Sequence, residues 1–348
     1  MCAYDRRISS APRAVFFGSS GPALSAGERA FFRASDPAGY ILFRRNIESA
    51  GQVEALVAAF RDCVGRADAP VLIDQEGGRV ARLPSPPWRK APPAAAFGEI
   101  AAADPARGAR AAHLNALLIG ADLRALGINV DCAPLLDLPV EGAHGIIGDR
   151  AFAADPATVA RLGRAACDGF LAAGVIPVIK HIPGHGRARV DSHESLPVVE
   201  TALDVLRASD FAPFRALADM PMAMTAHIVY TAIDAVRPAT TSPAVIGPVI
   251  RGEIGFDGLL MSDDICMKAL AGSLADRTRA VIDAGCDVVL HCNGDLAEME
   301  TVAASAPPLS ESGARRLAGA LGRVAGRPMP DATAARRELD DILRNRVA

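Results

Sequence analysis

Short apolar runs alternate with helical stretches along most of this chain of 348 residues. Each run is continuously apolar, which is typical of strands that are buried on both faces of a sheet. Eight runs occupy residues 14–17, 40–43, 70–73, 128–130, 176–179, 223–225, 258–261 and 287–290. Eight strand–helix alternations predict a (β/α)8 barrel. A doubly wound open sheet is the less favoured alternative, because no GxGxxG motif follows the first strand.

Helix-start signals separate several of the predicted strands. Ser25 with Glu28 fits a capping box, and Thr201 with Asp204 fits the same pattern with Asp in place of Glu. Residues 308–348 are rich in Ala, Arg and Glu and predict further helices. We therefore expect one catalytic barrel domain over residues 1–348, with residues 308–348 as C-terminal helices appended to it.

Polar and ionisable residues follow five of the predicted strands. Since a barrel gathers the carboxyl ends of its strands on one face, residues far apart in sequence are expected to meet in one pocket there. The alternative, that each polar residue only marks where a strand meets solvent, explains single cases better than the whole set. The residues concerned are Asp74, Lys180 with His181, His227, Ser262 with Asp263 and Asp264, and Cys292 with Asn293.

Composition and charge exclude some classes of function. The formal net charge is only −3, which argues against bulk electrostatic binding of nucleic acid. Aromatic residues make up 5% of the chain, too few to favour a base-stacking surface. No apolar run is long enough to span a bilayer, so we expect no membrane partner.

The seven cysteines and the amino-terminal segment bear on the compartment. The cysteine count is odd, no CxxC pair occurs, and several cysteines lie inside apolar runs, where a reduced thiol behaves as a small hydrophobe. Residues 1–13 are polar and lack the apolar core of a signal peptide. We expect a soluble, cytoplasmic protein.

The segment from residue 180 to residue 197 carries the densest candidate chemistry. Asp191 and His193 are two residues apart, so the carboxylate could orient the imidazole for proton transfer, although an isolated pair of this kind is more often a surface turn. A zinc site built from His181, His185, Asp191 and His193 is the competing interpretation. Their spacing matches no known ligand motif and Lys180 adjoins His181, so no metal is expected.

Asp263 is the leading candidate for a reactive carboxylate. It directly follows a strongly apolar strand, where it could serve as nucleophile, base or metal ligand. One of the pair Asp263 and Asp264 is expected to cap a helix instead. Four further residues at strand ends could hold sugar hydroxyls or anionic groups, or could equally form a structural ion-pair network; they are Asp74, Arg82, Arg150 and Lys180.

These motifs together resemble glycoside hydrolase family 3, and within it the bacterial β-N-acetylglucosaminidases of cell-wall recycling. The resemblance covers residues 14–293 and is most specific in KHIPGHG, in the DSH that follows four residues later, and in SDD. The remaining matching segments are ILFRRNI, IDQEGGRV, GDRAF, MTAH, PATTS, GFDGLLM and AGCDVVLHCN.

The resemblance implies a (β/α)8 barrel that removes terminal, non-reducing β-linked N-acetylglucosamine with retention of configuration. Asp263 matches the nucleophile position and His193 the acid/base position, assisted by Asp191. Positions that bind the sugar are matched by Asp74, Arg82, Arg150, Lys180 and His181. The implied substrate is N-acetylglucosaminyl-1,6-anhydro-N-acetylmuramic acid with or without its peptide, and a monomer without cofactor or metal is expected.

Rival functions on the same scaffold are a β-glycoside phosphorylase, a β-glucosidase or other β-hexosaminidase, and a non-catalytic muropeptide-binding protein. Arg187 and Arg189 stand where the family is expected to have smaller or acidic residues. They are predicted to lie at the pocket mouth and to pair with carboxylates of a peptide-bearing leaving group. The alternative is that both are ordinary solvated loop charges.

Overall fold

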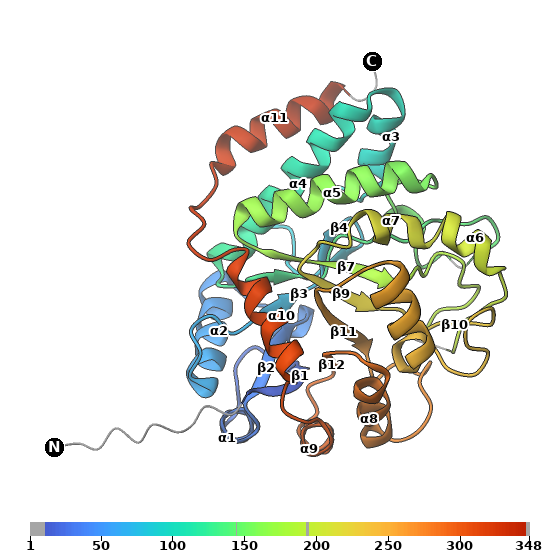
Figure 1. Cartoon of the computed structure of the whole chain (residues 1–348). Coiled ribbons are helices and arrows are strands. Elements are labelled where there is room, and N and C mark those ends of the chain that lie inside the picture. The colour runs from blue at the N-terminus through green and yellow to red at the C-terminus, as the bar shows by residue number, and fades with distance from the viewer. Residues whose placement is uncertain (1–10, 144, 193–194, 346–348) are drawn as a thin grey trace.

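The computed structural model describes residues 11–143, 145–192 and 195–345. Eight parallel strands form a closed barrel in the order β1-β12-β11-β9-β7-β6-β3-β2, so strands that follow one another in the sequence are neighbours in space (Figure 1). Each of the eight predicted strand ranges overlaps one barrel strand, and the predicted fold is confirmed. The strands are β1 Arg13–Phe17, β2 Pro37–Leu42, β3 Val71–Ile73, β6 Val130–Asp131, β7 Ile176–Ile182, β9 Met222–Thr225, β11 Leu259–Asp264 and β12 Val288–His291.

Helices surround the barrel and two small sheets extend its loops. The α-helices are α1 Ala26–Ser35, α2 Ala50–Val64, α3 Ala95–Ala103, α4 Pro105–Ala125, α5 Pro156–Ala173, α6 Leu203–Ala208, α7 Phe211–Ala216, α8 Leu274–Ala284, α9 Leu296–Ser305, α10 Glu311–Gly322 and α11 Ala332–Arg344. Short 3-10 helices are η1 Arg44–Asn46, η2 Gly148–Arg150 and η3 Ala239–Thr241, and η4 Val245–Glu253 is a π-helix. The small sheets pair β4 Gln75–Gly77 with β5 Val80–Ala81, and β8 Val198–Val199 with β10 Val229–Tyr230.

The two predicted capping boxes have different outcomes. At the start of α1 the Ser25 hydroxyl accepts the N–H of Glu28 at 3.1 Å, and the Glu28 carboxylate accepts the N–H of Ser25 at 2.7 Å. This box is confirmed. The prediction of a capping box at Thr201 is wrong. Helix α6 begins at Leu203, so the residue at the N-cap position is Ala202, whose side chain cannot accept a hydrogen bond.

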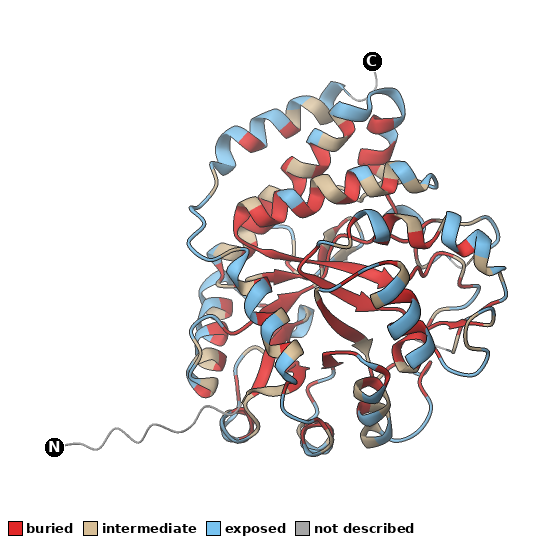
Figure 2. Ribbon diagram, viewed as in Figure 1, coloured by how far each residue is buried: buried red, intermediate tan, exposed pale blue. Residues whose placement is uncertain are grey.

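An apolar cluster fills the interior of the barrel, and α10 closes its amino-terminal end. Phe16, Ile41 and Met222 point into this cluster from three strands, and Leu317 of α10 belongs to it. The strands are buried along their length, whereas the surrounding helices are exposed on their outer faces (Figure 2). In barrels of this kind, binding sites lie at the carboxyl-terminal ends of the strands.

The last helix extends the layer of helices beside α4. Arg110 of α4 and Glu338 of α11 form a double hydrogen bond, with both N–O distances at 2.7 Å. The helices after residue 308 therefore pack on the barrel and its helices, as the sequence predicts (Figure 1). No helix among the described residues combines the length and the apolar character needed to cross a membrane.

Candidate active site

A pocket of about 300 Å³ lies at the carboxyl-terminal end of the barrel. This volume is at the lower end of the range for small-molecule sites, so it fits one small ligand unit. Loops after β3 and β5, the end of β7 and the end of β11 supply its polar wall. Six residues predicted from the sequence line this one pocket: Asp74, Arg82, Arg150, Lys180, His181 and Asp263.

The two remaining predicted residues belong to the loop after β7. Asp191 is half-buried and does not line the pocket, although the next residue, Ser192, does. His193, the predicted acid/base residue, lies outside the described residues. The loop that carries both residues therefore reaches the pocket at Ser192.

A buried ion-pair network forms one wall of the pocket. The ammonium group of Lys180 lies 2.9 Å from Asp74 and 2.7 Å from Glu76. Arg82 pairs with the second oxygen of Asp74 at 3.1 Å. Arg150 donates to both oxygens of Glu76, at 2.9 Å and 2.8 Å. The ion-pair network, one of the two alternatives raised by the sequence, is therefore present, and its members Asp74, Arg82, Arg150 and Lys180 also line the pocket. Their contact with a sugar stays a prediction.

The network keeps its members charged. Burial alone would raise the pKa of Asp74, but Lys180 and Arg82 outweigh burial and hold this pKa well below its usual range. Burial would also raise the pKa of Glu76, but Lys180 and Arg150 outweigh it and lower this pKa to about 2. Burial would lower the pKa of Lys180, but the two carboxylates raise it above its ordinary value. Asp74 is therefore an anionic hydrogen-bond acceptor at neutral pH.

Another buried carboxylate, Asp137, fixes the start of the loop after β7. One of its oxygens lies 2.7 Å from Nδ1 of His181, and it also accepts the backbone N–H of His185 at 2.6 Å. Burial would raise the pKa of Asp137, but the two histidines hold it below its usual value. Asp137 thus orients the His181 ring, which lines the pocket, and a contact of its Nε2 atom with a ligand stays a prediction.

Asp263 and Asp264 have different surroundings at the end of β11. The Asp264 carboxylate accepts the backbone N–H groups of Cys266 at 3.0 Å and Cys292 at 3.2 Å, so it joins the ends of β11 and β12. Its carbonyl oxygen lies 3.0 Å from Nε2 of the buried His227. Asp263 accepts the N–H of Asp264 at 2.8 Å and lines the pocket. The expectation that one of the pair caps a helix is wrong, because the residues after Asp264 form a turn and the next helix, α8, is capped by Ser273.

Arg187 does not have the position predicted for it. Its guanidinium group donates to the buried carboxylate of Asp210 at 2.7 Å and to the Ser209 hydroxyl at 3.0 Å, and it does not line the pocket. The predicted pairing of Arg187 with an anionic leaving group is wrong, because Asp210 already takes this role. Arg189 is exposed, and its predicted contact with substrate stays a prediction.

Sequence reasoning missed Glu76, Asp137 and the aromatic ring of Phe43. Glu76 is two residues from Asp74, on the same face of an extended segment, and this spacing could have indicated that both carboxylates face Lys180. No local signal marks Asp137. The guanidinium of Arg82 lies 5.4 Å from the centre of the Phe43 ring, a contact that only the barrel topology brings about.

Comparisons with known proteins agree with this geometry. The family model described as "Glycosyl hydrolase family 3 N terminal domain" matches residues 23–325. A β-hexosaminidase of Stenotrophomonas maltophilia is 38% identical over 89% of this chain and 92% of its own length. One from Methylococcus capsulatus is 40% identical over 88% of this chain and 91% of its own.

A solved structure, that of NagZ from Neisseria gonorrhoeae in complex with N-trifluoroacetyl-D-glucosamine, superimposes with a TM-score of 0.86. It is 29% identical in sequence and matches 96% of this chain and 98% of that chain. The family model spans most of the barrel, and the curated relatives match over nearly their whole length. The chain therefore belongs to glycoside hydrolase family 3 and is a glycoside hydrolase.

Proposed function

We propose that this chain is an exo-acting β-N-acetylglucosaminidase that hydrolyses terminal β-linked N-acetylglucosamine with retention of configuration. The observation that carries the proposal is the carboxylate of Asp263 in the same small pocket as the Asp74–Lys180 pair. A retaining glycosidase needs a carboxylate nucleophile beside groups that hold the sugar. The similar proteins named β-hexosaminidase, and the neighbour in complex with an N-acylglucosamine, support this choice of sugar.

In the proposed reaction, Asp263 attacks the anomeric carbon as the bond to the leaving oxygen breaks. His193 gives its proton to that oxygen, and the sugar is left esterified to Asp263. His193 then takes a proton from water, and the water oxygen displaces Asp263 from the anomeric carbon. Two displacements restore the original configuration. Asp191 is the positioning residue for His193, and the ordinary pKa of histidine lies close enough to neutral pH for both proton transfers.

The ion-pair wall has a separate task, the binding of sugar hydroxyls. The Asp74 carboxylate can accept hydrogen bonds, while Lys180, Arg82, Arg150 and His181 can donate them. Because Asp74 is already fixed by two cations, it needs little reordering when a sugar enters.

The natural substrate we propose is N-acetylglucosaminyl-1,6-anhydro-N-acetylmuramic acid, alone or with its peptide. The proposed enzyme is one catalytic domain over residues 1–348 that acts as a monomer and needs no metal or organic cofactor for catalysis. We place it in the cytoplasm, since all six cysteines among the described residues are free thiols.

Asp263→Asn should lower the turnover of a nitrophenyl β-N-acetylglucosaminide by several orders of magnitude, because the covalent step loses its nucleophile. Asp283→Asn, at an exposed position on α8, is the matched control and should retain full activity. A mechanism-based fluorosugar should label the wild-type chain at Asp263, as read by peptide mapping. Labelling of another carboxylate would refute the assignment. Release of a sugar 1-phosphate in phosphate buffer would instead indicate a phosphorylase.

His193→Ala should lower kcat/KM for a natural disaccharide by about 10²–10⁴-fold, because the sugar leaving group needs a proton. An activated nitrophenyl glycoside needs little protonation and should be affected much less. Asp191→Ala should give a milder form of the same pattern. Equal losses on both substrates would argue that His193 is not the proton donor.

Lys180→Met should reduce the free energy of unfolding at neutral pH by about 3–5 kcal/mol, because two buried carboxylates lose their shared cation. In the wild-type chain, the lowered pKa values of Asp74 and Glu76 contribute stability above the unfolded values near 4. That contribution is lost as the pH falls through the folded values, about 2 for Glu76.

The variant should therefore show a much weaker fall in stability between about pH 4.5 and pH 2. Denaturant unfolding at several pH values measures this dependence. Lys268→Met, at an exposed lysine, is the control and should keep the wild-type profile. An unchanged acid dependence in Lys180→Met would show that Lys180 does not hold the two carboxylates ionised.

A further inference from the structure

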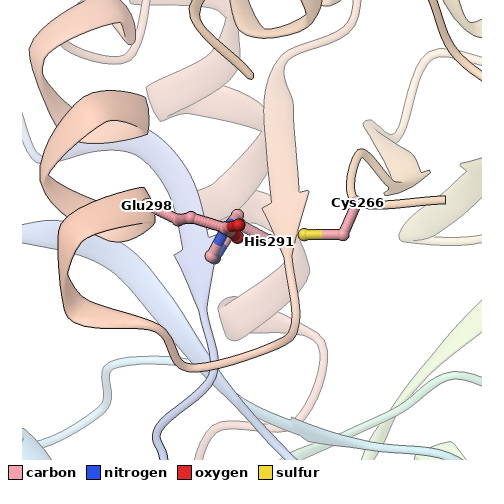
Figure 3. A group of neighbouring side chains, drawn as sticks. All are labelled: Cys266, His291 and Glu298. Carbon is pink, nitrogen blue, oxygen red and sulfur yellow. The ribbon is translucent and has the colours of Figure 1, made fainter. Parts of the chain in front are cut away.

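A second cluster of reactive side chains lies next to the pocket but does not line it. Cys266 follows β11, His291 is the last residue of β12, and Glu298 is in the first turn of α9. Figure 3 shows the sulfur of Cys266 pointing toward His291 and Glu298. Three separate elements thus bring together a thiol, an imidazole and a carboxylate, and none of the three lines the sugar pocket.

The spacing of the three side chains is close to that of a metal site. Their ligand atoms all lie within 4.8 Å of one another, and the ring of His291 is 3.3 Å from the Glu298 carboxylate. Tetrahedral ligands at about 2.0–2.3 Å from zinc are roughly 3.3–3.8 Å from each other. The His291–Glu298 pair already has this separation, so only Cys266 must move inward, by at most about 1.0–1.5 Å.

The imidazole of His291 is buried without enough hydrogen bonds. Its side chain is 0% exposed, and Nδ1 has no hydrogen-bond partner among the described residues. Among the described residues, the other nitrogen, Nε2, has only the Glu298 carboxylate as a hydrogen-bond partner, at the long distance of 3.3 Å. Because Nε2 is the nitrogen beside Glu298, a cation bound between the two side chains would replace this weak contact, whereas Nδ1 would keep no partner.

The other two side chains can be reached from solvent. Cys266 is half-buried, and burial together with Asp264 raises the pKa of its thiol to about 12, so it would ligate as a thiolate only when a cation is bound. The Glu298 side chain is 43% exposed, which gives an ion a route from solvent. Asn293 donates to the same Glu298 carboxylate and so orients it.

We propose that Cys266, His291 and Glu298 bind a divalent transition-metal ion of the zinc class, with water in the fourth position. Thiolate and imidazole ligands favour zinc or cobalt over the hard cations magnesium and calcium, which prefer oxygen. The site is separate from the hydrolytic groups, because none of its three ligands lines the sugar pocket. It goes beyond the proposed function, and hydrolysis does not require it.

Cobalt(II) provides a direct test, because a cobalt–thiolate bond gives an intense charge-transfer absorption in the near ultraviolet. Titration of the full chain with cobalt should produce this band with a stoichiometry of one ion per chain, and zinc should abolish it by displacement. Cys266→Ser should eliminate the band. Glu298→Gln changes a partly exposed side chain and leaves the core intact. It should weaken zinc binding by at least roughly 10–100-fold, which is the effect of losing a residue that only supports a metal ligand.

Cys286→Ser is the matched control, since Cys286 is a buried free thiol that contacts the carbonyl of Thr240 and does not belong to the cluster. It should retain the wild-type band and affinity. Absence of a cobalt–thiolate band in the wild-type chain would overturn the proposal. A band that survives Cys266→Ser and disappears in Cys292→Ser would place the ion in the sugar pocket and would overturn it as well.

Discussion

The arrangement of the pocket depends on one buried cation, the ammonium group of Lys180. It reaches from β7 to two carboxylates on the loop after β3, and it thereby joins two strands that the chain separates by a hundred residues. The desolvation of these charges is costly and is offset only while all partners are present. A site held in this way is rigid before substrate arrives, which is what selective binding of a sugar requires.

Elsewhere at the carboxyl-terminal end of the barrel, side chains also join the ends of neighbouring strands and loops. Asp137 fixes the loop after β7 through His181 and His185, and Asp264 joins β11 to β12 through two backbone N–H groups. These contacts set the backbone of the residue before Asp264, which is Asp263. Asp263 itself accepts the backbone N–H of Asp264 and lines the pocket.

The barrel could be predicted from the sequence because its strands are continuous apolar runs, a pattern set by burial on both faces. Four pocket residues could be predicted because they end or directly follow those runs, namely Asp74, Lys180, His181 and Asp263, whereas Arg82 and Arg150 lie in connecting segments outside the barrel strands. Asp137 could not be predicted, since it lies in an irregular segment and meets His181 only through the fold. The partner of Arg187 could not be predicted, because the buried Asp210 is distant in the sequence and only the fold brings the two side chains together.

The central claim is that Asp263 attacks the sugar and that water then displaces it, so that the product keeps the configuration of the substrate. A proton NMR spectrum of the released sugar, recorded in the first minutes before its two anomers interconvert in water, measures that configuration directly. The mechanism predicts that the β-anomer of N-acetylglucosamine appears first and later converts to the mixture. Initial appearance of the α-anomer would contradict a covalent intermediate on Asp263.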